Sequence, residues 1–421
     1  MTDSLNPMPT HLFLFGSPVS RERLSWIADA LKIFFVNRLP EAFRQPTIAG
    51  AEPVASFFLT GDALYSLHDR DTLPLWESIL SLPAVRVTCD REEMDLRGIS
   101  VEALKVKFPQ QVLDQNGRRI SHPRSFWRGL VQAAGKSAPG SAALGYLQLS
   151  SPYMHRSAGL AVSCLQAALE EGVGAELYAY LDGVHAGHVN QRPSEERNVG
   201  EGIEELDRIA RKRALPFQAI ACERCAAARG YSTWDDGKGV AVSACTIPPV
   251  KIRNLNAVVA RFATSRVILG EDAADVSTAP AHRLAPGGWL AGEADPPPVL
   301  ILVTRSPYGT EHAFGALSLA IACAHQEIAT RVVFLEDGIH ALLGRHSAGP
   351  DDPVFNLQEV IEASGGRDLQ LYAFQPSFLA RGITRGEGLP SVLDIGMKEL
   401  GEILFETPKG IRADRQRVIF F

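Results

Sequence analysis

The chain is poor in cysteine, has no long apolar run and carries only a weak excess of charge, and each shortage excludes a class of protein. Its 421 residues include six cysteines, too few for a disulfide scaffold, so a functional cysteine here is expected to act as a thiol. The longest apolar stretch, residues 313–324, contains Ser318 and falls short of the ~20 residues that a membrane span needs. A net charge of −6 argues against a large nucleic-acid surface, which would be basic.

The remaining composition is ordinary for a globular chain, with 46% apolar and 21% charged residues. The first residues lack the basic region of a secretory signal, and the apolar run 12–15 is too short to be its core. We therefore expect a cytoplasmic protein that contacts neither membrane nor nucleic acid directly. The length predicts about three domains, each able to bury its own core.

Three segments of the chain begin alike, with an apolar run that ends in Ser-Pro. Short apolar runs rich in strand formers indicate buried strands. A stretch with helical spacing of apolar residues follows each Ser-Pro. The Ser-Pro pairs are Ser17-Pro18, Ser151-Pro152 and Ser306-Pro307, and the helical stretches are 21–35, 159–169 and 315–324.

Two later landmarks recur in the same order. A second apolar run leads into an acidic-Gly turn in each segment, near residues 57–62, 177–183 and 332–338. A third run is followed by Arg-Gly, at Arg97-Gly98, Arg229-Gly230 and Arg381-Gly382. Because the spacing from Pro to Arg is nearly constant, an internal repeat is favoured over unrelated units that share dipeptides.

The alternation of strands and helices predicts an α/β fold with mostly parallel sheets and right-handed crossovers. We predict three tandem units, each a small open sheet with helices on both faces. The predicted boundaries are 1–136, 141–270 and 299–421, with a Pro/Ala/Gly-rich linker over 271–298.

The most informative thiol follows the third run of the middle segment. Residues 217–221 are a strand candidate, and Ala226 to Arg229 favour helix. Cys222 therefore falls at or near a helix N-cap, where backbone N–H groups and the helix dipole favour a thiolate. Arg224 or Arg229 would add positive charge. A thiolate there can attack a sulfane sulfur or a disulfide and can carry a persulfide.

The other cysteines are less distinctive. Cys164 and Cys323 lie in apolar helical stretches and are predicted core residues, and Cys245 is ambiguous. Cys89 ends the equivalent run of the first segment, nine residues before its Gly98 where Cys222 is eight before Gly230, and is a possible secondary thiol. The third segment has no thiol there.

These motifs resemble the DsrE/DsrF/DsrH family, which includes the TusB, TusC and TusD sulfur-relay subunits and YchN-like proteins. The middle unit resembles DsrE or TusD, and the third resembles DsrF or TusC through residues 306–313 and 334–339. The first resembles a degenerate member. The resemblance implies flavodoxin-like units and a cysteine, matching Cys222, that receives persulfide sulfur, often from a TusA-like carrier protein. It also implies face-to-face pairing of trimers, so a homodimer of this chain would be a six-unit particle.

The predicted function is a cytoplasmic sulfur relay, a sulfurtransferase-like carrier that accepts sulfane sulfur on Cys222 and passes it to a partner thiol. Cys225 is the second catalytic candidate, as a resolving thiol. Thiol exchange needs no cofactor and no metal.

Three alternatives stay open. Cys222 and Cys225 form half of a zinc signature, and His185 and His188 follow the preceding strand, so the four side chains are an acceptable tetrahedral set. The same two cysteines can instead form a redox dithiol. The third alternative is a scaffold of a sulfur-metabolism complex without a reactive thiol. The basic segment 208–213 is predicted to be the solvated face of a helix, with docking of an acidic carrier as its functional alternative.

Overall fold

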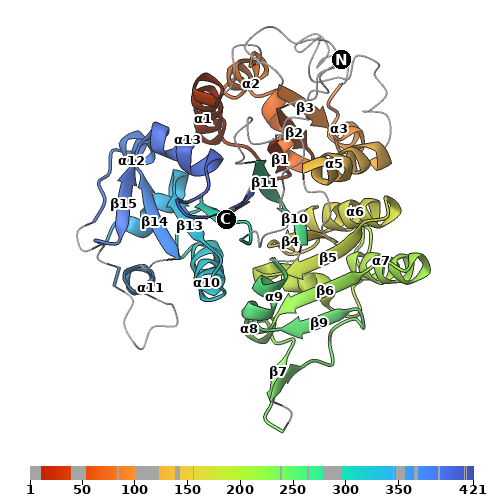
Figure 1. Ribbon diagram of the computed structural model, residues 1–421. Coiled ribbons are helices and arrows are strands. Elements are labelled where there is room, and N and C mark those ends of the chain that lie inside the picture. The colour runs from red at the N-terminus through yellow and green to blue at the C-terminus, as the bar shows by residue number, and fades with distance from the viewer. Residues whose placement is uncertain are drawn as a thin grey trace, which may run out of the picture.

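A computed structural model of the chain gives the arrangement in Figure 1. It describes residues 11–38, 54–82, 85–100, 123–137, 143–154, 156–237, 239–262, 265–277, 295–344, 346–347, 356–364, 368–386, 389–411, 413 and 415–421. The names first part, second part and third part are used below for residues 11–137, 143–270 and 295–421.

The first and third parts share one nine-stranded sheet, with strand order β15-β14-β13-β12-β16-β11-β1-β2-β3. Only β11 runs antiparallel to its neighbours, β1 and β16, and every other pair is parallel. The strands are β1 (His11–Phe15), β2 (Ala55–Leu59), β3 (Val85–Cys89), β11 (Asp272–Ser277), β12 (Val299–Val303), β13 (Thr330–Phe334), β14 (Leu369–Phe374), β15 (Val392–Ile395) and β16 (Arg415–Phe420).

The second part has its own parallel five-stranded sheet, in the order β10-β4-β5-β6-β9. A short antiparallel hairpin, β7 with β8, projects from it (Figure 1). The strands are β4 (Ala143–Gln148), β5 (Gly174–Ala179), β6 (Phe217–Cys222), β7 (Thr233–Asp235), β8 (Val240–Val242), β9 (Val250–Arg253) and β10 (Ser265–Gly270). The third part repeats this order with β16-β12-β13-β14-β15.

Helices connect the parallel strands, as the sequence predicts. None of the helices in the described ranges combines the length and the apolar character that crossing a membrane requires. The helices are α1 (Arg21–Arg38), α2 (Leu73–Leu80), α3 (Arg91–Leu96), α5 (Pro123–Ser137), α6 (Ser157–Glu170), α7 (Val199–Arg213), α8 (Glu223–Ala228), α9 (Leu255–Phe262), α10 (His312–His325), α11 (Leu357–Ala363), α12 (Gln375–Arg381) and α13 (Met397–Phe405), with 3-10 turns η2 (Gly61–Leu67), η3 (Leu181–Gly187) and η5 (Glu336–Leu342).

The central strands are apolar without alternation because both faces of the sheet are covered. On β1, Leu12 and Leu14 enter one hydrophobic core, whereas Phe13 and Phe15 enter the other. Successive side chains of a strand point to opposite faces, so a strand buried on both sides needs an apolar residue at every position. This explains the runs that precede each Ser-Pro.

The mostly parallel α/β class is confirmed, but the expectation of one separate sheet per unit is wrong. The structure joins the first and third parts edge to edge through β11 and β16. The predicted linker 271–298 is also wrong at its start, because β11 is a strand with Ala273 and Ala274 fully buried. Residues 278–294 of that linker lie outside the described residues, and the other predicted boundaries stay predictions.

Two glycines show how tightly the turn after the second strand approaches the first. Gly183 and Gly338 occupy the same place in η3 and η5, three residues after Tyr180 and Leu335, the N-cap residues of these turns. A Cβ on either would overlap a strand carbonyl oxygen, that of Gln148 or of Val303. The acidic-Gly turn is therefore a steric requirement of the packing.

Candidate functional site

Cys222 is the last residue of β6 and the N-cap of α8, as the sequence predicts. On the sheet it lies opposite Arg253 of β9. Its relative exposure is 2%. A residue with so little exposed surface is reachable only through a cavity, so the lining around it decides what it can do.

The surroundings of Cys222 favour its thiolate. The hydrogen bond that Cys225 donates to it is the largest influence, and together with the backbone N–H groups of Cys225 and Arg224 and the charge of Arg224 it lowers the pKa of Cys222 to about 7 against the opposing effect of burial. Charge-assisted donors at a helix start stabilise an anion in this way. A thiol with this pKa is about half ionised at neutral pH.

Cys225 has the opposite character. The hydrogen bond with Cys222 raises the pKa of Cys225, and burial raises it further. The backbone N–H of Leu181 donates to Cys225 Sγ at 3.3 Å, and Leu181 itself has a left-handed φ of 53°. By itself the Leu181 N–H favours the Cys225 thiolate, but the hydrogen bond with Cys222 and burial outweigh it, so Cys225 stays the neutral donor toward Cys222.

A cavity of about 480 Å³ opens at these two cysteines, between the second and third parts. Below it is named the Cys222 cavity. The second part contributes Tyr180, Cys222, Arg224, Cys225 and Arg229, and the third part contributes Pro307, Tyr308, Glu311, Phe314 and Ser318. Its walls are therefore partly apolar and carry two guanidinium groups, those of Arg224 and Arg229.

An arginine clamp joins the two parts at one edge of this cavity. Arg229, of the predicted Arg-Gly pair, donates to Asp182 at 2.7 Å and to Glu311 at 2.6 Å. Asp182 belongs to the acidic-Gly turn of the second part, and Glu311 lies just before α10 of the third. The clamp explains why the Arg-Gly and acidic-Gly landmarks recur together.

Two further contacts tie α10 to the cysteine site. The guanidinium carbon of Arg224 lies 4.6 Å from the centroid of the Phe314 ring. The Tyr180 hydroxyl donates to the carbonyl oxygen of Gly315 at 3.0 Å. These contacts place the third part directly against the residues that surround Cys222.

The term junction is used below for the contact between two parts of the chain. At the other two junctions a different residue takes the place of the Cys222 thiol. The N-cap residue of α3 is Asp90, and that of α12 is Phe374. Each precedes its Arg-Gly arginine, Arg97 or Arg381, by the same interval as Cys222 precedes Arg229. Asp90 is thus the counterpart of Cys222 in the first part. The signal in the sequence is the interval counted back from Arg-Gly, because the same interval that gives Cys222 gives Asp90 and not Cys89.

Cys89 lies one residue before that position, within β3. It is fully buried, and burial, reinforced by the charge of Asp90, raises its pKa to about 12. Such a thiol stays protonated near neutral pH. Its role as a secondary thiol stays a prediction and gains no support from this environment.

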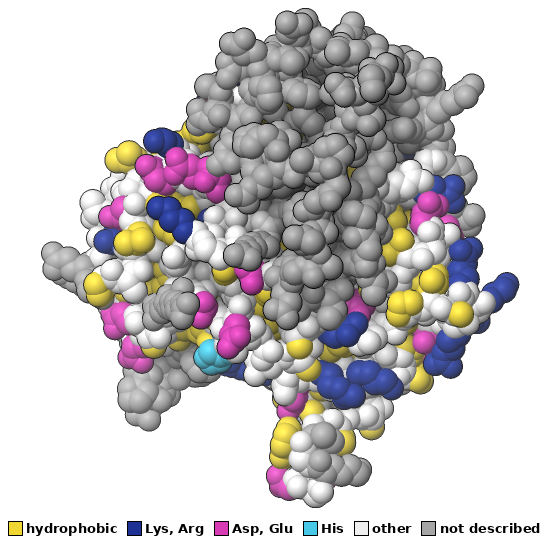
Figure 2. Space-filling view, in the orientation of Figure 1, with side chains coloured by type: hydrophobic (Ala, Val, Ile, Leu, Met, Phe, Trp, Pro, Cys, Tyr) yellow, Lys and Arg dark blue, Asp and Glu magenta, His cyan; other side chains and the backbone are white. Residues whose placement is uncertain are grey.

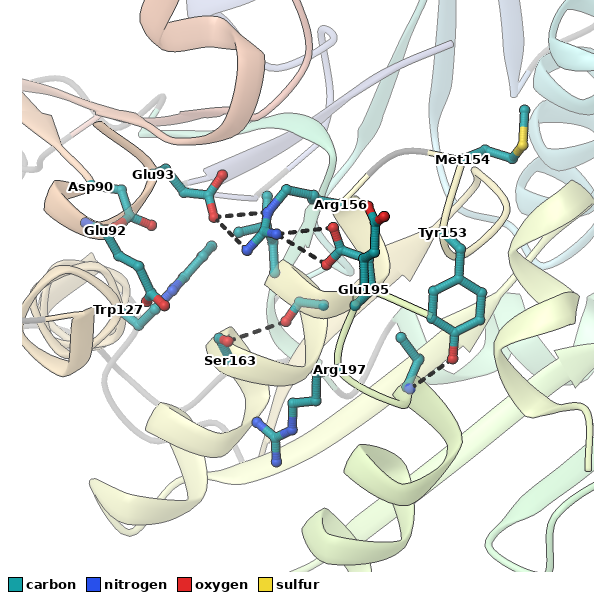
Figure 3. Close-up of a pocket in the computed structure, with 14 residues that line it drawn as sticks. Asp90, Glu92, Glu93, Trp127, Tyr153, Met154, Arg156, Ser163, Glu195 and Arg197 are labelled. Carbon is teal, nitrogen blue, oxygen red and sulfur yellow. Dashed lines mark hydrogen bonds and ion pairs between the residues drawn. The ribbon is translucent and has the colours of Figure 1, made fainter. Parts of the chain in front are cut away.

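A second cavity, of about 460 Å³, lies between the first and second parts at Asp90 (Figure 3). Below it is named the Asp90 cavity. Thr60 donates to Asp90 at 2.9 Å, and burial raises the pKa of Asp90 to about 6. Arg156 reaches Glu93 at 3.0 Å across the junction. In place of a thiolate beside arginines, this junction holds a carboxylate beside other carboxylates.

The junction between the third and first parts completes the comparison. Arg381 pairs with Asp337 of its own part at 2.9 Å and with Glu22 of the first part at 2.8 Å. Glu22 and Glu311 each stand four residues after the Ser-Pro proline, where the second part has Arg156. An arginine thus pairs with a glutamate of the next part at the Cys222 junction and at the junction of the third and first parts. At the Asp90 junction the charges are exchanged, because the next part supplies Arg156 and the first part supplies Glu93.

The zinc alternative is not supported by the placement of its ligands. In the described part of the chain no three His, Cys, Asp or Glu side chains are grouped so that they can hold a metal ion. His185 instead contacts the hydroxyl of Tyr231, and burial lowers the pKa of His185. The two histidines and two cysteines are therefore not one ligand set.

The remaining predicted features are surface or core. Cys164 and Cys323 are fully buried in α6 and α10, as expected, and Cys245 is partly exposed. Lysines and arginines gather over α7 in Figure 2. Arg211 there is paired with Asp207 at 2.8 Å, which fits the solvated helix face that the sequence predicts.

Comparison with known proteins gives one family match, which lies in the third part, and two similar proteins. Residues 298–409 match the model of the DsrE/DsrF-like family. An uncharacterized protein of Methanopyrus kandleri is 27% identical over 94 residues, which make up 22% of this chain and 75% of that protein. The crystal structure of the YchN protein from E. coli aligns with a TM-score of 0.24 and 24% identity, over 30% of this chain and 99% of that one.

Proposed function

We propose that this protein is a sulfur relay in which Cys222 accepts sulfane sulfur as a persulfide and passes it to a partner thiol. The observation that carries the proposal is a thiol with a pKa of about 7 that lines a cavity. The DsrE/DsrF-like match of residues 298–409 supports it, since that family is generally associated with sulfur relay. No cofactor enters the proposed chemistry.

The proposed transfer is two thiol-exchange steps. The Cys222 thiolate attacks the outer sulfur of a donor persulfide, the donor's S–S bond breaks, and the donor leaves as a thiolate. Cys222 then carries the persulfide. An acceptor thiolate attacks that outer sulfur, and Cys222 leaves as a thiolate again. The pKa of Cys222 suits both halves, because an attacking thiol is fastest when its pKa is near the ambient pH, and a lowered pKa makes a thiol a better leaving group.

Cys225 has two candidate roles in this scheme. As a neutral donor it stabilises the Cys222 thiolate, both before attack and as leaving group. As a resolving thiol it would attack the inner sulfur of the Cys222 persulfide, release hydrosulfide and form a Cys222–Cys225 disulfide, which a dithiol reductant then opens. The second role requires Cys225 to lose its proton, against its raised pKa, so we favour the first.

We further propose that the chain consists of three tandem DsrE-like units, with one unit carrying the thiol. The support is the strand order common to the second and third parts and the recurrence of the arginine beside the acidic-Gly turn at Arg97, Arg229 and Arg381. The proposed setting is the cytoplasm, the proposed donor a TusA-like carrier, and the proposed assembly a homodimer with six units.

Intact-mass analysis after incubation with a sulfane-sulfur donor tests the function. The wild-type chain should gain whole sulfur atoms that a reductant removes, and Cys222→Ser should gain none. Cys245→Ser is the matched control, because Cys245 is partly exposed and should leave the gain unchanged. Sulfur that still adds to Cys222→Ser would refute the assignment. A result in which only Cys245→Ser fails to gain sulfur would refute it as well.

A further inference from the structure

The third part has no thiol at the position of Cys222, yet it forms one wall of the Cys222 cavity. Its contribution centres on α10, which begins at His312 and carries Phe314 in its first turn. Phe314 lines the cavity and is only partly buried. An aromatic ring at a cavity wall has either a packing role or a specific partner, and here the partner is Arg224.

The geometry of that partnership is a cation–π contact. The Arg224 guanidinium carbon lies 4.6 Å from the Phe314 ring centroid, within the ~6 Å over which such contacts are attractive. Arginine is a long, rotamer-rich side chain, and a stacking partner limits the positions that its charge samples. Arg224 is two residues after Cys222, in the first turn of α8, so its charge is held where it acts on the thiolate.

The other two junctions serve as internal comparisons. At the Asp90 cavity the corresponding pair is Glu92 and Gly159, which both line that cavity. At the third junction the corresponding residues are Pro376 and Ser25. Within the described residues, an arginine and an aromatic ring occupy these two positions at the junction that holds the thiol. They do not occupy them at the junctions that hold Asp90 or Phe374 in its place.

We propose that Phe314 is a positioning residue for the Cys222 site: its ring holds the Arg224 guanidinium beside the thiolate, so that the third part conditions the nucleophile of the second. This inference rests on the proposed function only in taking Cys222 as the reacting thiol. It assigns to the third part a role beyond that of a structural partner.

Other charged and titratable groups also surround Cys222 and have to be kept constant in any test. The second part supplies Tyr180, Asp182, Glu223, Cys225, Arg229 and Arg253, from the end of β5, η3, α8 and β9. The third part supplies Tyr308 and Glu311. Because Arg229 is fixed by Asp182 and Glu311 independently of Phe314, replacing Phe314 leaves the second guanidinium of the cavity in place.

The test is the pH dependence of Cys222 alkylation by iodoacetamide, without any sulfur donor, read by mass spectrometry of the peptide that ends at Arg224. Phe314→Leu keeps an apolar side chain but removes the ring. We expect its alkylation midpoint to rise by up to roughly half a pH unit, because the charge of Arg224 is the weakest of the influences that lower the pKa of Cys222, with the same plateau rate at high pH. Phe314→Tyr should retain the wild-type midpoint.

A double-mutant cycle shows whether the effect passes through Arg224. In Arg224→Gln the tryptic peptide extends to Arg229 and carries both cysteines, so fragmentation is used there to place the adduct on Cys222. Arg224→Gln should raise the midpoint at least as far as Phe314→Leu, and the double variant should rise no further than Arg224→Gln. An unchanged midpoint in Phe314→Leu, or fully additive shifts, would overturn the proposal. If the midpoint shifts as expected while no sulfur loads onto Cys222, the positioning role stands and the sulfur-relay function fails.

Discussion

The Cys222 and Asp90 cavities are built on the same framework and differ in the N-cap residue and in the side chains that follow it. Both lie where a third parallel strand passes into a short helix, and both are closed by the segment that follows Ser-Pro in the next part. One presents a thiol whose pKa is lowered to about 7, and the other a carboxylate whose pKa is raised to about 6. The framework supplies the position, and the hydrogen bond from Cys225 in one cavity and burial in the other are the main causes of the opposite pKa shifts.

Moving the thiol between the cavities gives the largest expected effect. In a Cys222→Ser chain, Asp90→Cys places a thiol at the same N-cap position, but Glu92 and Glu93 replace Arg224 and Cys225 beside it. The negative neighbours raise the pKa of a thiol. We expect sulfur loading at pH 7 to be at least about tenfold slower than wild type. A rate equal to wild type would show that position alone suffices.

The ion pairs at the Asp90 and Cys222 junctions should contribute differently to the free energy of unfolding. Glu93 is 2% exposed and accepts from both Arg97 and Arg156. Glu93→Gln should therefore lower the free energy of unfolding by about 2–3 kcal/mol, because a buried charge partner is lost.

Glu311 is the matched control at the other junction, since its side chain is 56% exposed beside Arg229. Glu311→Gln should lower the free energy of unfolding by about 1 kcal/mol or less. Urea denaturation of both variants checks the ranking. Equal losses would mean that the two junctions are held together in the same way.

Acid titration of Asp90 tests the opposite pKa shift at the second cavity. Its pKa rises from 3.8 to about 6 on folding, mainly by burial, so between these values the folded state binds the proton that the unfolded state has lost. The contribution of Asp90 to stability is therefore greatest below pH 4 and falls as the pH rises through 6. Asp90→Asn should gain about 2 kcal/mol over wild type at pH 7 relative to pH 4. Parallel stability curves for the two proteins would contradict the raised pKa.

The sequence predicted the elements around Cys222 because each has a local signal. An apolar run, an alanine-rich stretch and Arg-Gly place the strand, the helix and its end within a few residues of one another. The position of Asp90 was missed because it depends on where α3 begins, a boundary of one residue that helix propensity does not fix.

Long-range features escaped the sequence for a different reason. The strand β11, Asp272–Ser277, is as polar as a loop, but Arg23 pairs with Asp272 at 3.2 Å, and Arg415 pairs with Asp275. Buried carboxylates are acceptable only when such partners arrive from distant segments. The contact between Arg224 and Phe314 is likewise tertiary, and no local sequence pattern predicts it.

Site-resolved mass spectrometry of the sulfur-loaded protein tests the central claim most directly. Trypsin cleaves after Arg224 and so separates Cys222 from Cys225 in the sequence, which lets one sample report on each thiol. After brief exposure to a sulfane-sulfur donor at pH 7 and trapping with an alkylating agent, the added sulfur should reside on the Cys222 peptide, with Cys89 and Cys245 unmodified. Sulfur found on Cys245, or on no cysteine while the donor is consumed, would contradict the account.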